Sequence, residues 1–349
     1  MAYTTIDNPE LYFQAKLFTG TGSSHAITFD GDEDMQPDLV WIKSRTTTNS
    51  HALYDAVRGA TKTLRSNTTG AEATSSQSLT SFDSDGFSVG SDGQENGSGR
   101  NYASWNWKAS NSTASNTDGT INTSSTSANT TAGFSISTYT GTGSTATVGH
   151  GLGVAPAMII IKARSFVEDW IVYHQSTGNT VKLDLNTTNA TDASVNYWQN
   201  TTPTSSVFYI GANDRLNKSG ATYVAYCFAE KKGYSKFGSY VGNSSSDGVY
   251  VHLGFRPAWF MFKDTESTTS WIIKDNKRLG YNGIVPHLQA NTNDAENTDG
   301  WSEVDFLSNG IKLRNADNSM NKSGSKFIYM AFAESPFVNS AGAVPNNAR

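Results

Sequence analysis

The chain has 349 residues, a net charge of −5 and a charged fraction of only 16%, and Ser, Thr, Asn and Gly crowd the sequence between short apolar bursts. This length suits two or three ordinary domains, and the composition is typical of β-rich proteins with few helices. The acidic balance, the lack of a Lys/Arg stripe and the lack of an apolar run of roughly 18 residues argue against nucleic-acid binding and membrane insertion.

The N-terminus shows no basic segment followed by an apolar one, so we expect a chain that is made in a cytoplasm and carries no export signal. Cys227 is the single cysteine, which rules out a disulfide within the chain. Because Cys227 lies in an alternating apolar run, we interpret it as a small buried residue, not as a nucleophile.

Near the N-terminus, residues 11–14 resemble a protease tag site, but the stretch that follows them is repeated later in the chain. Residues 17–22 read Leu-Phe-Thr-Gly-Thr-Gly, residues 138–143 read Thr-Tyr-Thr-Gly-Thr-Gly, and a looser copy occupies residues 239–243. The opening stretch therefore belongs to the protein and begins a repeat.

Each copy continues to a Pro and then to a dense apolar strand that ends in Lys. These strands occupy residues 37–43, 156–162 and 257–263. Second strands follow a polar turn at residues 52–55, 170–174 and 271–275. Each pair is predicted to form a hairpin, with the first strand covered on both faces.

Each copy closes with Asn-x-Ser-Gly and an aromatic-rich strand, and the first and third copies carry an Asp-Gly or Asn-Gly turn before it. The closing asparagines are Asn96, Asn217 and Asn321, which follow the strand-ending lysines Lys43, Lys162 and Lys263 by 53, 55 and 58 residues. Over residues 217–230 and 321–334, 7 of 14 positions are identical. This near-constant spacing predicts a conserved sheet register.

We therefore predict an all-β chain of tandem β-sandwich modules in three repeats of about 100 residues. Module 1 spans residues 1–108, module 2 residues 133–232, and module 3 residues 233–349 including a C-terminal tail. Residues 109–132 are rich in Ser, Thr and Asn and are predicted to be a flexible or extended linker.

The acidic stretch at Asp30, Asp32 and Asp34 is the candidate metal site, because alternating carboxylates can wrap a hard cation. A helix-loop calcium site fails here, since Met35 stands where Gly is needed, and a solvated loop is the better interpretation. No nucleophile or zinc motif is present, so we predict no catalytic residues, no enzyme activity and no cofactor.

Aromatic residues are the candidate ligand-binding groups, because an aromatic ring in a loop can stack on a sugar. Tyr197 and Trp198 lie in a polar stretch, and Asn186 lies in a polar turn. These three residues are the candidate ligand-binding site, with core packing as the alternative for Trp198. For Trp105 and Trp107, which share one face of a strand, core packing is favoured.

Several stretches carry a resemblance to a known family, namely residues 1–20, 139–174, 221–242, 254–278 and 331–349. Together they resemble virion proteins of tailed phages that infect marine bacteria, cyanobacteria among them. The resemblance implies a structural or host-adhesion protein with a concanavalin-like or jelly-roll β-sandwich, and it brings no catalytic residues.

These observations predict a phage virion protein on the particle surface, either a tail fibre or tail-associated adhesin or a head decoration or fibre protein. Expected partners are other capsid or tail proteins, further copies of the chain with a trimer as one form, and host surface polysaccharide. A polysaccharide depolymerase of the particle is the alternative. A free carbohydrate-binding module ranks third.

Overall fold

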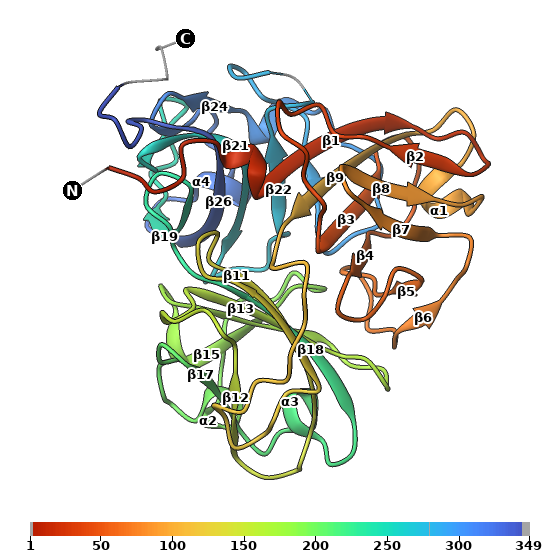
Figure 1. The fold of residues 1–349 in the computed structure, drawn as a ribbon. Helices are drawn as coiled ribbons and strands as arrows, with labels where there is room; N and C mark the ends of the chain where they lie inside the picture. Colours follow the sequence, from red (N-terminus) through yellow and green to blue (C-terminus); the bar gives the residue numbers. More distant parts are fainter. Residues whose placement is uncertain (1–2, 279, 344–349) are drawn as a thin grey trace.

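The computed structural model describes residues 3–278 and 280–343, which consist almost wholly of antiparallel strands joined by turns (Figure 1). Helical structure is confined there to short pieces, four α-helices of four residues each and two 3-10 turns. The predicted all-β class is confirmed. The last tail residues, 344–349, lie outside the described part of the chain.

The strands fall into three groups along the chain, which we call modules 1, 2 and 3. Module 1 contains η1 (Pro9–Leu11), β1 (Phe13–Thr19), β2 (His25–Ile27), β3 (Leu39–Ser44), β4 (Ala52–Asp55), β5 (Lys62–Thr63), β6 (Ala73–Thr74), β7 (Leu79–Asp83), β8 (Gly86–Val89), α1 (Gly93–Asn96) and β9 (Asn101–Trp107). Module 2 and the segment before it contain β10 (Ser125–Asn129), β11 (Phe134–Thr140), β12 (Ala146–Gly149), β13 (Met158–Ala163), β14 (Trp170–His174), β15 (Gly178–Asp184), β16 (Asp192–Ala193), α2 (Val195–Trp198), β17 (Val207–Ile210), α3 (Asp214–Asn217) and β18 (Thr222–Phe228). Module 3 contains β19 (Ser235–Val241), β20 (Tyr250–His252), β21 (Phe255–Asp264), β22 (Ile272–Asp275), β23 (Leu288–Gln289), η2 (Gly300–Ser302), β24 (Val304–Leu307), β25 (Gly310–Leu313), α4 (Asn318–Asn321) and β26 (Lys326–Pro336).

The three modules share one strand order. The large sheets run β1-β9-β3-β4 in module 1, β11-β18-β13-β14 in module 2 and β19-β26-β21-β22 in module 3, with extra strands at the sheet ends of the last two. Each module also has a small sheet, β2-β8-β7, β12-β17 or β20-β25-β24, and β5 and β6 form a further two-stranded sheet in module 1. The predicted hairpins are present as the antiparallel pairs β3–β4, β13–β14 and β21–β22.

Each large sheet is buried on both faces. In β3, Val40 and Ile42 belong to a core inside module 1, while Leu39 and Trp41 belong to a second, shared core. The strands β13 and β21 divide their side chains in the same way. This explains why the three strands are apolar without alternation, since no position faces water.

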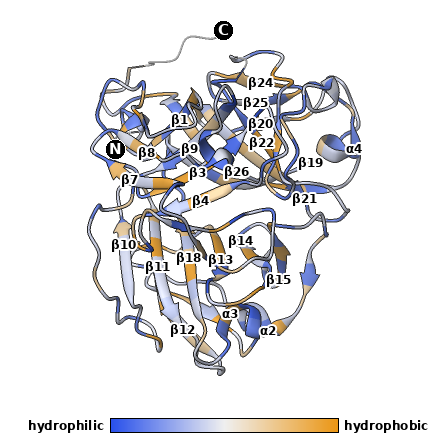
Figure 2. Cartoon of the chain, turned by 90° about the vertical axis from the view of Figure 1, so that its right-hand side faces the viewer, coloured by the Kyte–Doolittle hydropathy of each residue, from blue (hydrophilic) through white to orange (hydrophobic). Residues whose placement is uncertain are grey.

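The shared core lies where the three large sheets meet, and it joins the modules into one body (Figures 1 and 2). Its aromatic centre draws on every module, with Trp107 packed edge-on against Phe228 at 6.3 Å and against Trp259 at 5.6 Å between ring centroids. Removing a fully buried Trp from such a core costs about 3–5 kcal/mol.

In each module the opening motif around the Thr-Gly or Val-Gly pair is hydrogen-bonded to the closing Asn-x-Ser-Gly motif. In module 1, Asn96 is fully buried, and its Oδ1 accepts the Thr21 N–H at 2.8 Å. A Cβ on Gly20 would lie 2.3 Å from the Gly97 carbonyl oxygen, so only glycine fits there. The same clamp recurs as Asn217 with Thr142 and Gly141, and as Asn321 with Asn243 and Gly242.

The segment 109–132 differs from a free linker because part of it is built into module 2. Its strand β10 pairs antiparallel with β11, from Ser125 opposite Thr138 to Asn129 opposite Phe134. The chain also crosses to the small sheet, where Ile121 bridges Val148. The segment therefore covers one side of the module 2 sandwich.

Candidate functional site

The three modules meet at three equivalent junctions, which form a closed ring. At each junction a backbone N–H at an equivalent position donates to a carbonyl of the neighbouring module. The N–H of Glu72 donates to Arg164 O, that of Glu296 to Arg45 O and that of Thr191 to Thr265 O, at 2.8, 2.8 and 3.0 Å. The ring therefore runs from module 2 to module 1, from module 1 to module 3, and from module 3 back to module 2.

Buried ion pairs strengthen two of these junctions. Where modules 1 and 3 meet, Arg45 forms a bidentate pair with Glu296, at 2.8 and 3.0 Å. Glu296 also accepts from the buried Arg278, which pairs with Asp275 at 2.8 Å. Asp275 in turn accepts the indole N–H of Trp105 at 3.0 Å. The chain of contacts thus returns to module 1.

The junction of modules 2 and 1 repeats this network. Arg164 forms a bidentate pair with Glu72, Arg58 bonds both Glu72 and Asp55, and the Tyr226 hydroxyl donates to Asp55 at 2.7 Å. Burial alone would raise the pKa of Glu72, but the hydrogen bonds and charges of Arg164 and Arg58 lower it overall. Glu72 therefore stays ionised in the fold.

The junction of modules 3 and 2 lacks both arginines. His174 stands where the other modules have Asp55 and Asp275, and its Nε2 bonds the Tyr329 carbonyl at 3.1 Å. Burial lowers the pKa of this imidazole to about 4. The imidazole of His174 is therefore neutral at ordinary pH.

The three strand-ending lysines lie at the same junctions. The Nζ of Lys162 donates to Thr69 O in module 1 at 3.2 Å, and that of Lys263 donates to Thr188 O in module 2 at 3.2 Å. Lys43 bonds Ser44 O and Thr47 O. Burial lowers the pKa of each of the three ammonium groups to about 8. Lys162 and Lys263 therefore link two modules, while the hydrogen bonds of Lys43 stay within module 1.

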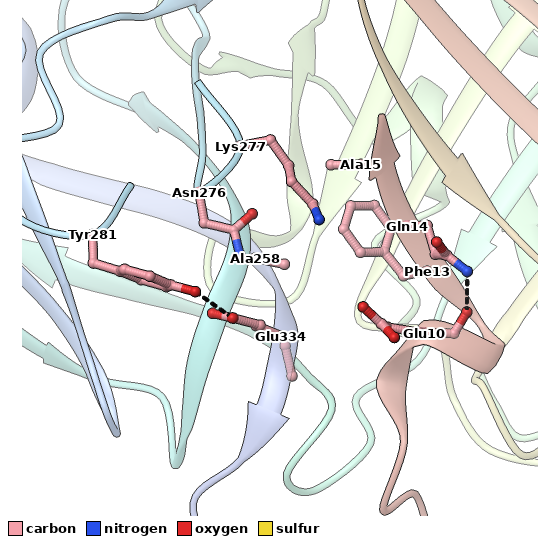
Figure 3. A pocket seen from close by; sticks show the side chains of 10 residues that line it. Glu10, Phe13, Gln14, Ala15, Ala258, Asn276, Lys277, Tyr281 and Glu334 are labelled. Carbon is pink, nitrogen blue, oxygen red and sulfur yellow. Dashed lines mark hydrogen bonds between the residues drawn. The ribbon is translucent and has the colours of Figure 1, made fainter. Parts of the chain in front are cut away.

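The junction of modules 1 and 3 also holds a pocket of about 500 Å³, counted with its open mouth (Figure 3). It is lined by Glu10, Phe13, Gln14, Ala15, Ala258, Asn276, Lys277, Tyr281, Ala333 and Glu334. Two polar atoms in it, Oδ1 of Asn276 and Oε2 of Glu334, are buried without a partner among the described residues. We call this the junction pocket.

The junction of modules 2 and 3 shows why the pocket exists, because the equivalent place there is filled. Phe237 of β19 pairs with Met330 in β26 just as Ala15 of β1 pairs with Trp105 in β9. The Phe237 carbonyl accepts from Gln175 Nε2 at 2.6 Å, and its N–H donates to Glu230 at 3.4 Å.

At the pocket, Asn276 and Glu334 replace Gln175 and Glu230. Asn276 follows the last residue of β22 as Gln175 follows the last residue of β14. Asn is one methylene shorter than Gln and makes no bond to Ala15. The outward N–H and C=O of Ala15 and the two acceptors are left facing a gap.

The junction pocket can bind a ligand that donates hydrogen bonds. Glu334 accepts the Tyr281 hydroxyl through one oxygen and keeps the other unpaired, and Lys277 reaches toward the same space (Figure 3). Buried acceptors without partners carry a free-energy cost that a bound hydroxyl or amine relieves.

The predicted ligand residues Tyr197 and Trp198 lie away from the junction pocket, and the expectation that they are exposed is wrong. Both side chains are buried, with 5% and 1% exposed, in the inner core of module 2. Short helix α2 turns Trp198 inward, where its indole N–H donates to Val181 O at 3.0 Å and its ring packs on Tyr173. A ring in this position has no open face for a sugar.

Asn186 is also fully engaged in structure. Its Oδ1 accepts the Trp170 N–H at 2.8 Å and its Nδ2 donates to Asp169 at 2.7 Å. Asn67 and Asn291 make the same bond to His51 N and Trp271 N in the other modules. Asn186 is therefore a repeated turn clamp, and the structure gathers none of the three predicted ligand residues at the junction pocket.

The candidate metal residues Asp30, Asp32 and Asp34 are exposed on a loop, and Asp30 pairs with Lys16. Among residues 3–278 and 280–343, no three His, Cys, Asp or Glu side chains come together as metal ligands. The metal expectation therefore gains no support from the geometry. No helix in this part of the chain is long and apolar enough to cross a membrane.

Other residues singled out in the sequence take the structural places expected of them. Trp105 and Trp107 are buried in the shared core. Cys227 is buried, and burial raises the pKa of its thiol. The residues that sequence reasoning missed are those of the junction pocket, because they come from two modules and no single stretch brings them together.

Fold and junctions define a class of protein: a single all-β body of three sandwich modules closed into a ring, with a pocket at one junction. The chain belongs to a family defined by a domain of unknown function, DUF7483, which matches residues 8–336 and so takes in all three modules. No curated protein matches the chain.

Proposed function

We propose that the protein is a structural protein of a phage particle, exposed on its surface as a tail fibre or tail-associated adhesin or as a head decoration or fibre protein. The resemblance of five long stretches to phage virion proteins supports this role. A single all-β body joined by a shared core and buried ion pairs is also a suitable architecture for a particle surface.

The proposed ligand is a host surface glycan, and the junction pocket is its binding site. The observation that carries this proposal is the pair of buried, unpartnered acceptors, Asn276 Oδ1 and Glu334 Oε2. Sugar hydroxyls are the donors that such a pair accepts, and Glu10 at the rim adds a further carboxylate (Figure 3).

Binding to host polysaccharide is the test, measured by titration of the purified full chain with fragments of the host's surface glycan. Asn276→Gln should lower affinity at least tenfold, because a longer amide can cap Ala15 and fill the gap. Gln175→Asn, the matched change at the closed junction, should leave affinity unaltered. Equal binding by both variants would remove the pocket from the proposal.

The position on the particle is tested separately by cryo-electron microscopy of intact virions. Density for this chain on the capsid would favour decoration, and density at the tail with the junction pocket outward would favour adhesion. The expected partners are other particle proteins and further copies of the chain. Mass measurement of the purified protein tests the trimer.

A depolymerase is the second candidate, because Glu10 and Glu334 place two carboxylates in one pocket. Glycoside hydrolysis uses a pair of carboxyl groups, one as acid and one as nucleophile or base. Release of reducing ends from host polysaccharide, lost in both Glu10→Gln and Glu334→Gln, would support this candidate. Binding without release of reducing ends would support the adhesin.

A further inference from the structure

In each sandwich the first strand of the large sheet and the first strand of the small sheet lie at the same side, at the ends of their sheets as far as the module's own strands extend. In module 2 this side is covered by the segment that precedes the module. The strand β10 pairs with the outer edge of β11, and Thr120 and Ile121 bond Thr147 on the outer edge of β12. Ile121 is buried in the module 2 core.

In module 1 the same side is a groove of about 670 Å³, open to solvent, between β1 and β2. Lys108 N–H donates to Tyr12 O, and Gly20 N–H donates to Arg100 O. Even-numbered residues of β1 therefore bond to β9, and odd-numbered ones such as Leu17 direct their backbone groups outward.

The outer edge of this groove has no partner within residues 3–278 and 280–343, where β1 ends its sheet. Ala26 is exposed on β2 at the place that Thr147 occupies on β12. The Nδ1 of His25, which lines the groove, is buried without a hydrogen-bond partner among these residues. The outward backbone groups of β1 and the Nδ1 of His25 thus lack partners that an added strand could supply.

Module 3 differs at the equivalent place. The difference does not lie in a lysine that crosses from the first strand, because Lys236 Nζ donates to His252 O at 2.9 Å in module 3, and Lys16, which lines the groove, pairs with Asp30 in module 1. Tyr250 stands in the position of Ala26 and carries a bulky ring. Its outer edge is thus obstructed, which is one way that natural sheets prevent strand addition. Module 1 has a small residue instead.

We propose that the groove between β1 and β2 is a docking site for an extended segment of another protein chain, rich in Ser, Thr and Ala, which adds as an antiparallel strand to β1. The covering segment of module 2 identifies this chemistry, since it is the occupant of the equivalent site. Main-chain hydrogen bonds would hold the segment, and one apolar side chain placed like Ile121 would anchor it. The inference does not depend on glycan binding.

The test uses the full chain and a synthetic peptide with the sequence of residues 110–129. Binding is followed by fluorescence anisotropy of the labelled peptide and by hydrogen exchange. We expect exchange of the Leu17 and Ala26 amides to slow at least tenfold. A peptide N-methylated at Ser127, whose equivalent in β10 faces β11, should bind at least tenfold more weakly, while methylation at Ala128 should change little.

A protein variant, Ala26→Pro, removes one outward N–H, and its melting temperature verifies that it folds. It should weaken peptide binding at least fivefold. Absence of binding at 1 mM peptide, equal binding of both methylated peptides, or protection confined to module 3 would overturn the proposal. Self-association of the full chain that Ala26→Pro abolishes would also overturn it, because the occupant would then be a second copy.

Discussion

Two junctions of the ring differ at two equivalent positions: Gln175 is replaced by the shorter Asn276 at the end of a hairpin, and Phe237 by Ala15 on the facing strand. Where modules 2 and 3 meet, Gln175 and Glu230 cap the backbone of Phe237. Where modules 3 and 1 meet, Asn276 and Glu334 leave Ala15 uncapped and two acceptors unpaired. A pocket can thus arise in a repeat protein when one copy has a shorter side chain at a position where the equivalent side chain of another copy makes a hydrogen bond.

The largest effect on stability is expected from Arg278, which lies at the junction of modules 3 and 1 and has no equivalent arginine at the junction of modules 2 and 3. Arg278→Ala leaves Asp275 buried without its cation, while Glu296 keeps Arg45, and the loss costs about 3–5 kcal/mol of unfolding free energy. Thr177 follows His174 by the same spacing and bonds only a carbonyl, so Thr177→Ala should cost at most about 1 kcal/mol. Denaturant unfolding of both variants measures the difference, and similar losses would contradict this account.

Acid should weaken the junction of modules 2 and 3 through His174. Its folded pKa of about 4 lies below the unfolded value of 6.5, so the unfolded chain binds more protons between these values. Its contribution, present above pH 6.5, is therefore lost as pH falls from 6.5 to 4, by about 3 kcal/mol for this shift.

Thermal unfolding between pH 7 and 4 measures this loss. His174→Gln should flatten the profile, while the other buried histidines, whose pKa values are also lowered by burial, keep part of the slope. An unchanged profile in this variant would assign acid sensitivity to those histidines instead.

Exchanging the two amides should alter stability by a smaller amount. Gln175→Asn breaks the bond to Phe237 O and should destabilise by about 1 kcal/mol, the usual net value of one hydrogen bond. Asn276→Gln should be neutral or stabilising by up to about 1 kcal/mol. A crystal structure of Asn276→Gln with the pocket still open would contradict the methylene argument.

The smallest effect is expected from Lys277, which is exposed at the mouth of the junction pocket. Lys277→Ala should change the unfolding free energy by less than about 0.5 kcal/mol, as is usual for surface positions. It should nevertheless alter the affinity for acidic glycans more than that for neutral ones. Equal change for both glycans would show that the ammonium takes no part in binding.

Much of the fold could be predicted because it is repeated and local. The apolar runs ending in Lys43, Lys162 and Lys263 mark strands with two buried faces, and the Thr-Gly and Asn-x-Ser-Gly motifs turned out to clamp each other. These signals are readable because each depends on spacing within one module.

The site was not predictable in the same way. Trp198 lies among polar residues, and only the turn of α2 and the carbonyl of Val181 bring it inside. The junction pocket joins Glu10 to Asn276 and Glu334, which are far apart in the chain. Aligning the three repeats and comparing Gln175 with Asn276 would have drawn attention to this position, but not to the strand it faces.

The shared core also sets conditions for synthesis. Trp107 leaves the ribosome long before Phe332, on which it packs at 5.6 Å between ring centroids. At about 5–20 residues per second, translation of the chain between them lasts on the order of 10–40 s. During that time module 2 can cover only part of the inner face of the first sheet, because Trp107 packs on Phe228 but also on Trp259 and Phe332 of module 3. Chaperones that shield apolar surfaces should therefore raise the yield of soluble protein, and chains terminated after module 2 should aggregate.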